Sequence, residues 1–203
     1  MLRFDAVGEG INALKVLVAS ENKKVGALLS FQHSNKKQCD TCFLFESKEN
    51  EVAQLLKEYP GEKFNQGEFT KEEMPTALHM RQTALSTAAM VLDVEEGGHA
   101  EEFLIKGFAS ALLQVSEVGN VIIYLSHSPC TTSDRAPSES LPGWPKSCTA
   151  KLSKLAGQYP KYSFIVVYYK KYGHLETIRD DRDAAAFLKN LVKDRGNLGF
   201  TEL

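Results

Sequence analysis

The chain has 203 residues, of which 43% are hydrophobic and 25% charged, and its formal net charge is -2. A chain of this length and composition can bury one ordinary core and fold as a single domain over residues 1–203. The net charge by itself does not indicate a nucleic-acid binder, because phosphate contacts require a local excess of Lys and Arg.

Hydropathy and cysteine content indicate the cellular compartment. No run of 18 apolar residues is present, and Asp5 and Glu9 interrupt the region where a secretory segment would need apolar residues. We therefore expect no membrane segment and an intracellular protein, cytoplasmic or nuclear. Four cysteines are too few for a disulfide scaffold, which leaves metal binding, catalysis or burial.

The first elements are predicted from hydrophobic periodicity. Residues 10 to 20 show helical spacing, residues 25 to 32 form an apolar run typical of a buried strand, and residues 42 to 46 form a second such run. The two runs are predicted to pair as a hairpin. Two helical stretches separated by a polar loop follow, and we interpret them as an insertion at about 48–92.

The second half of the chain predicts alternating helices and strands. A helix with an apolar stripe is expected from His99 to about Val115. The expected elements after it are a central strand at 120–126, a Pro- and Ser-rich loop insertion at 131–147, a helix at 148–157 capped by Ser147, a strand at 162–169, a shorter strand at 174–179 and a helix at 183–193.

Two short motifs carry the chemistry. The triplet His99-Ala100-Glu101 begins the first of these helices, and Pro129-Cys130 follows the central strand after 27 intervening residues. This pattern resembles H-x-E…P-C-x-x-C, the signature of the zinc-dependent nucleobase deaminases. The resemblance implies that His99 and Cys130 bind Zn²⁺ and that Glu101 transfers protons as the catalytic residue.

The second cysteine of the signature is displaced. Thr131, Thr132 and Ser133 follow Cys130, and the next cysteine is Cys148. Because a helix N-terminus stabilises a thiolate, Cys148 is predicted to be the third zinc ligand despite the insertion. In the alternatives, Cys148 is a buried small hydrophobe while Asp134 or a water completes the site, or no zinc binds.

The order of elements also resembles the zinc-dependent cytidine deaminase superfamily. This resemblance implies an α/β fold of three α/β/α layers, in which a mixed five-stranded sheet has helices on both faces. Val25 to Leu29 and the hairpin expected near 168–179 resemble free cytidine deaminases and imply an antiparallel final hairpin. Ser126-x-Ser128-Pro129-Cys130 instead resembles S-W-S-P-C of the AID and APOBEC type, with His127 in place of Trp; bacterial deaminase toxins share the hairpin.

Substrate contacts are expected from two regions. Tyr168 to Tyr172 place tyrosines and lysines at the end of a strand, where related polynucleotide deaminases read a neighbouring base; aromatic rings stack bases and lysines meet phosphates. In the alternative, the tyrosines alternate between buried and exposed positions for packing, and the lysines protect the edge of the sheet. The residues expected to contact substrate are Ala100, His127, Ser128, Trp144, Tyr169, Lys170 and Tyr172.

From Lys146 onward, eleven basic residues stand against six acidic ones. This excess fits either a basic rim that guides a phosphate backbone or ordinary solvated faces.

These residues favour hydrolytic deamination of cytosine to uracil in single-stranded DNA or RNA. The Asn-x-Glu element that grips ribose in free cytidine deaminases is missing or displaced, because Asn50 directly precedes Glu51. Free cytidine or deoxycytidine remains the alternative substrate. A catalytically inactive binding protein with the same fold is the alternative from another class.

Cys39-x-x-Cys42 has a spacing used by zinc knuckles and redox motifs. A structural zinc site needs four ligands, and only the distant His33 and His79 could complete it. We interpret the pair as ordinary thiols in a hairpin.

Overall fold

The structure is a computed structural model, and it describes residues 1–19, 24–35, 37–48, 98–130, 141, 143–145, 147–170 and 196–202. The chain divides into two compact units, one of Met1–Ser47 with His99–Leu203 and one of Lys48–Gly98. All the helices and strands described here belong to the first unit. Lys48 and Gly98, at the two ends of the second unit, exchange two backbone hydrogen bonds.

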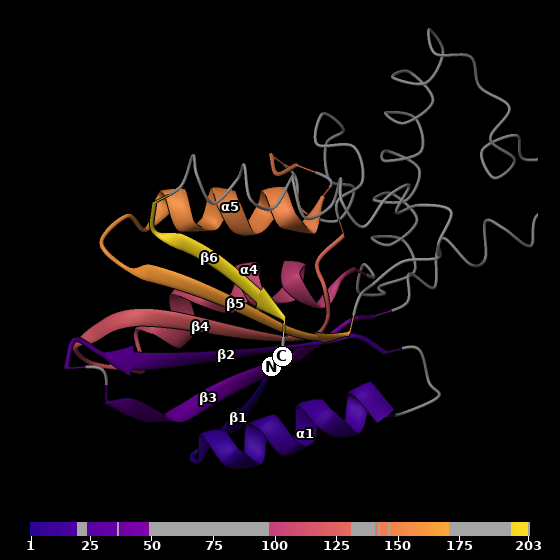
Figure 1. Cartoon of the computed structure of the whole chain (residues 1–203), viewed down its shortest axis with the longest axis horizontal. Coiled ribbons are helices and arrows are strands. Elements are labelled where there is room, and N and C mark those ends of the chain that lie inside the picture. The colour runs from indigo at the N-terminus through magenta and orange to yellow at the C-terminus, as the bar shows by residue number, and fades with distance from the viewer. Residues whose placement is uncertain are drawn as a thin grey trace, which may run out of the picture. The chain divides into compact units, whose positions relative to one another are not determined.

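The described part of the chain forms an α/β fold with a mixed six-stranded sheet and three helices (Figure 1). In chain order, the elements are β1 (Leu2–Phe4), α1 (Val7–Ala19), β2 (Gly26–His33), β3 (Gln38–Glu46), α4 (Ala100–Leu112), β4 (Val118–His127), α5 (Cys148–Gln158), β5 (Ser163–Lys170) and β6 (Leu198–Glu202). The strands lie in the order β1-β3-β2-β4-β5-β6. Those up to β4 pair antiparallel, whereas β4, β5 and β6 are parallel.

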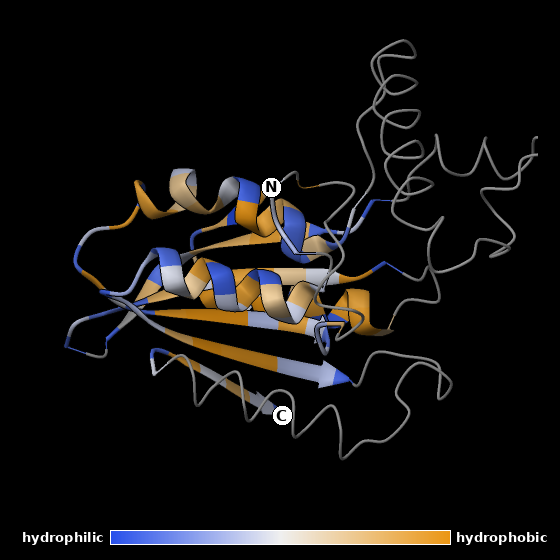
Figure 2. Ribbon diagram, turned by 90° about the horizontal axis from the view of Figure 1, so that it is seen from above, coloured by the Kyte–Doolittle hydropathy of each residue, from blue (hydrophilic) through white to orange (hydrophobic). Residues whose placement is uncertain are grey.

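The sheet separates two clusters of buried side chains, because successive residues of a strand point to opposite faces. On one face, Leu14 of α1 packs with Leu28 of β2 and Leu44 of β3. On the other face, Leu104 and Phe108 of α4 and Leu152 of α5 pack with side chains of β2, β3, β4 and β5. Figure 2 shows hydrophobic residues in orange along the strands.

Two glycines allow the helices to approach the sheet closely. A Cβ atom at Gly10 of α1 would lie 2.5 Å from the Cys42 Sγ atom, and one at Gly107 of α4 would lie 2.6 Å from a ring carbon of Phe45. Both distances are shorter than van der Waals contact allows, so a larger residue would force the neighbouring side chain or the helix to shift.

Most predicted elements are confirmed, with shifted boundaries. The hairpin of β2 and β3, the helices α1, α4 and α5, and the strands β4 and β5 lie where the sequence predicted them. The helices and loop predicted inside 48–92, the strand at 174–179 and the helix at 183–193 lie outside the described residues.

The predicted number of five strands is wrong. The structure adds β1 and β6, which were not predicted, because segments of three and five residues are too short to show a periodic pattern. The second strand of the expected antiparallel final hairpin, at 174–179, lies outside the described residues. Among the described strands, β6 lies parallel to β5 from Phe164 to Tyr168 and occupies the edge of β5 that faces away from β4.

Among the described residues, no helix combines the length and the apolar character needed to cross a membrane.

A candidate metal centre at two helix N-termini

Helix α4 brings two of the expected residues to one point. His99 is its N-cap, with extended backbone angles (φ -74°, ψ 152°), and Glu101 is its second residue. The Glu101 side chain is buried, with 3% of its surface exposed, while His99 is exposed on one side. The first turn therefore presents an imidazole and a carboxylate at the end of the helix.

Cys130 reaches the same point from the end of β4, close to the N-terminus of α5. Ser147 caps α5, and its Oγ atom donates a hydrogen bond of 3.1 Å to the Cys130 carbonyl oxygen. The same oxygen accepts bonds from the Thr149 backbone N–H (3.2 Å) and Oγ1 (2.9 Å). The Cys148 N–H points at the Cys130 Sγ atom, 3.3 Å away. These bonds bring the two cysteines together although 17 residues separate them in sequence.

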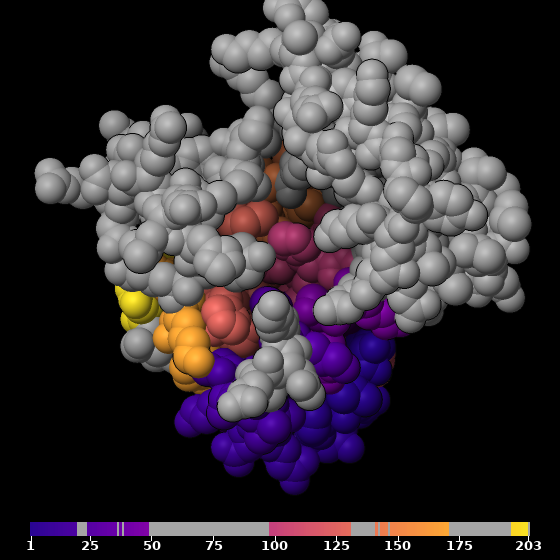
Figure 3. Space-filling view, turned by 90° about the vertical axis from the view of Figure 1, so that its right-hand side faces the viewer, coloured from indigo at the N-terminus to yellow at the C-terminus, as the bar shows by residue number. Residues whose placement is uncertain are grey.

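His99, Cys130 and Cys148 form a group that could hold a metal ion, since their ligand atoms lie within 4.8 Å of one another. The His99 Nδ1 atom lies 3.2 Å from the Cys148 Sγ atom. One imidazole and two thiolates are donors suited to zinc and other borderline transition metals. The predicted displaced cysteine is thus brought to the other two residues. Figure 3 faces this side of the molecule and shows atoms in the magenta-to-orange colours of α4, β4 and α5 at its centre.

The surroundings of Cys130 favour its thiolate form even without a metal. Hydrogen bonds from the Cys148 thiol, from His99 and from the Cys148 N–H lower the pKa of Cys130 to about 4, against the opposing effect of burial. The pKa of Cys148 is correspondingly raised by its hydrogen bond to Cys130 and by burial. The pKa of His99 is raised, chiefly by its hydrogen bond with Cys130. A bound cation would replace the protons that these groups share, because metal ligands must be deprotonated.

Glu101 is the strongest local indication that the group binds something. Burial raises the pKa of its carboxyl above the ordinary value. Its Oε2 atom is buried and makes no hydrogen bond within the described part of the chain. A buried oxygen without a partner is costly, so it calls for a functional explanation. A metal ion held by the three donors, with water in an open position, fits this carboxylate.

Sequence reasoning missed two residues beside this group. Glu102 and Lys151 form an ion pair of 2.6 Å, and their side chains are only 4% and 2% exposed. The position of Glu102 carries a signal, because a Glu at the third residue of a helix commonly hydrogen-bonds back to the N-cap. Indeed, the Glu102 Oε2 atom accepts a 2.9 Å bond from the His99 N–H. No sequence signal marks Lys151, since its partner lies on another helix.

The other residues expected near the substrate lie in several environments. Ala100 is fully buried in the core. Half-buried His127 hydrogen-bonds the Ser126 Oγ atom through Nδ1 at 3.1 Å, and burial, with nearby Lys170, lowers its pKa. The Ser128 N–H donates to the Lys170 carbonyl oxygen at 2.6 Å.

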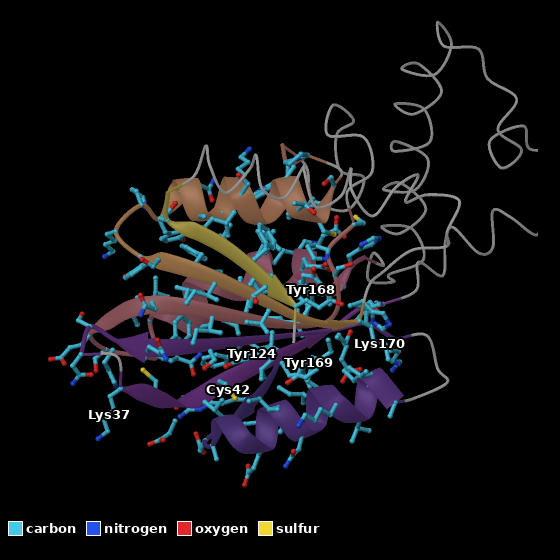
Figure 4. All side chains as sticks on the ribbon, viewed as in Figure 1. Lys37, Cys42, Tyr124, Tyr168, Tyr169 and Lys170 are labelled. Carbon is cyan, nitrogen blue, oxygen red and sulfur yellow. The ribbon has the colours of Figure 1, made fainter. Side chains whose placement is uncertain are left out.

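The strand end with its tyrosines serves packing in large part. Tyr169 and Tyr124 pack on the α1 side of the sheet and Tyr168 on the α4 side, as Figure 4 shows. The Lys170 Nζ atom donates a 2.8 Å bond to the Val18 carbonyl oxygen near the end of α1. Tyr172 lies outside the described residues.

Trp144 belongs to the inserted loop and packs against the α4 and α5 side of the core. The Lys154 Nζ atom lies 5.0 Å from the centre of its ring and donates to the Gly143 carbonyl oxygen at 2.7 Å. Among the described basic residues after Lys146, three bind groups of the fold itself: Lys151, Lys154 and Lys170.

The interpretation of Cys39 and Cys42 as separate thiols agrees with their placement. They lie three residues apart on β3, so they face opposite sides of the sheet, one in each buried cluster. The Cys39 Sγ atom lies 3.3 Å from the His33 Nε2 atom. A shared metal site for the two thiols is excluded by this geometry.

Comparison of the sequence with protein-family models finds no matching family, and no curated protein matches it either.

Proposed function

We propose that this protein is a zinc-dependent deaminase that hydrolyses cytosine to uracil in single-stranded DNA or RNA. The observation that carries the proposal is the buried Glu101 carboxyl group beside the group of His99, Cys130 and Cys148, with an oxygen that has no hydrogen-bond partner among the described residues. The chain places all four residues of the resembled signature in one site. It does so without the short spacing between the two cysteines.

The residues divide the chemical tasks among them. His99, Cys130 and Cys148 would hold the metal, leaving a position open for water. A bound zinc lowers the pKa of its water from about 15.7 to about 7 and so supplies hydroxide at neutral pH. Glu101 would take a proton from that water and pass it to the ring nitrogen. It would then carry a second proton, from the hydroxyl added to the ring carbon, to the amino group that leaves as ammonia. Burial raises the pKa of the Glu101 carboxyl, which favours acceptance of a proton.

A polynucleotide substrate is supported by the resemblance of Ser126-x-Ser128-Pro129-Cys130 to S-W-S-P-C and by the missing or displaced Asn-x-Glu element. The parallel pairing of β5 and β6 differs from the antiparallel final pair that the resemblance to free cytidine deaminases implies. Free cytidine stays the alternative substrate, because Val25 to Leu29 resembles those enzymes.

The test is uracil formation by purified protein on single-stranded DNA, single-stranded RNA, duplex DNA and free cytidine, with metal content measured in parallel. Glu101→Gln should keep the metal but lower the rate about 10²- to 10⁴-fold, because it cannot transfer the proton. Glu9→Gln, an exposed residue of α1, is the matched control and should behave as wild type.

The outcomes separate the candidate functions. Product from a single strand that depends on Glu101 supports the proposal. Product from cytidine alone would show that the substrate is the free nucleoside and not a polynucleotide. Absence of product from every substrate, with no metal bound, would leave a binding protein without this activity.

A further inference from the structure

A charged pair is buried between the two helices of the candidate metal centre. The Lys151 Nζ and Glu102 Oε1 atoms lie 2.6 Å apart, and neither side chain is more than 4% exposed. Removing two charges from water is costly, so a buried pair is poor evidence of a contribution to stability alone. Its retention is better explained by the geometry that it enforces.

The pair joins the segments that carry two of the metal donors. Glu102 accepts from the His99 N–H at 2.9 Å with one oxygen and binds Lys151 with the other. Lys151 follows Cys148 by three residues on α5, so the two side chains lie on neighbouring positions of one helix face. A single carboxylate thus connects the backbone of His99 to the helix that carries Cys148.

We propose that Glu102 and Lys151 are positioning residues that hold the N-termini of α4 and α5 at the separation required for His99 and Cys148 to bind one metal ion. This inference rests on the metal centre of the proposed function. The hydrogen bonds to the Cys130 carbonyl oxygen fix the end of β4 to α5. The ion pair provides the corresponding directional link between α4 and α5.

An ion pair suits this task because its charge-assisted hydrogen bond has a preferred geometry, whereas the hydrophobic effect has no preferred direction. The three donors come from separate segments, and 17 residues intervene between the two cysteines, so no short loop fixes their spacing. Neighbouring groups that orient metal ligands commonly contribute 10- to 100-fold to metal affinity.

The test uses the full chain with Glu102→Gln and Lys151→Met combined. Gln keeps an oxygen for the His99 N–H, Met keeps the volume of the lysine stem, and no unpaired charge remains buried. Circular dichroism and thermal melting report the fold, chelator competition gives the zinc affinity, and the visible spectrum of the Co²⁺-substituted protein reports ligand geometry. We expect a folded protein with zinc affinity lowered about 10- to 100-fold and a changed Co²⁺ spectrum.

Lys106→Met removes an exposed lysine of α4 and is the matched control, expected to match wild type. Wild-type affinity and spectrum in the double variant would overturn the inference and leave the pair a purely structural role.

If the double variant does not fold, Glu102→Asp replaces it, because a carboxylate shorter by one methylene cannot reach both partners. Reduced zinc affinity in this variant supports the positioning role, and unchanged affinity overturns it. A wild-type protein that binds neither zinc nor Co²⁺ would instead refute the metal centre itself, and with it the proposed function.

Discussion

Cys39 and Cys42 lie within a strand, whereas Cys130 and Cys148 lie where a strand ends and a helix begins. Within the strand, backbone groups are used by the sheet, and the two side chains point to opposite faces. At the start of a helix, N–H groups that no helical bond uses can bond to other groups, and the Cys148 N–H points at the Cys130 Sγ atom. Donor atoms converge in the second region although its cysteines are far apart in sequence.

The same contrast appears in acidity. Burial raises the pKa of Cys42 to about 11, partly offset by a backbone hydrogen bond. Hydrogen bonds lower the pKa of Cys130 to about 4. Burial among apolar groups keeps a thiol protonated, and donors at a helix N-terminus favour the thiolate that metals require.

The largest expected effect is on metal content. Cys148→Ser should lower the zinc content of purified protein from about one equivalent to near zero, because three protein ligands are the minimum of a catalytic site. Elemental analysis measures this directly. The combined Cys39→Ala and Cys42→Ala variant should keep its zinc. If the combined variant lost its zinc and Cys148→Ser kept it, the metal would have to bind at the hairpin of β2 and β3 instead.

The second prediction concerns thiol reactivity in the metal-free protein. Only the thiolate is alkylated, so the rate at a thiol should fall tenfold per pH unit below its pKa. Between pH 8 and pH 6, alkylation should therefore change less than about twofold at Cys130 and fall about a hundredfold at Cys42. Iodoacetamide labelling followed by peptide mass analysis gives both rates.

A Cys130 rate that declines below pH 8 as steeply as that of Cys42 would show that the hydrogen bonds around Cys130 do not form. The sign for stability follows from the same shift. Because the folded pKa lies below the ordinary 9.0, this thiolate stabilises the metal-free fold at high pH. The contribution is lost as pH falls towards about 4.

The smallest effect is expected at the helix cap. Ser147→Ala removes both the bond from the Ala150 N–H and the bond to the Cys130 carbonyl oxygen. It should lower the free energy of unfolding of the metal-free protein by about 1–2 kcal/mol. Urea unfolding measures this change. Ser110→Ala, at an exposed position of α4, is the control, and its free energy of unfolding should stay within about 0.5 kcal/mol of wild type. An equal decrease in the two variants would show that the cap has no special role.

The predictable part of the fold rests on long, regular segments. Residues 25 to 32 predicted β2 because a strand buried on both faces is a continuous apolar run, and Ser147 predicted the start of α5 because it is a good N-cap. The strand β1 escaped prediction because three residues show no period. The direction of β6 depends on a partner that is distant in sequence.

The candidate site divides in the same way. The sequence by itself determined the types of residue, since the pattern from His99 to Cys130 contains the donors and the carboxylate within elements of predictable type. Only the tertiary structure decided that Cys148 meets them, because hydrogen bonds between the end of β4 and α5 replace the missing short spacing. It alone revealed Glu102 and Lys151 as a pair, since contact between helices depends on how both pack against the sheet.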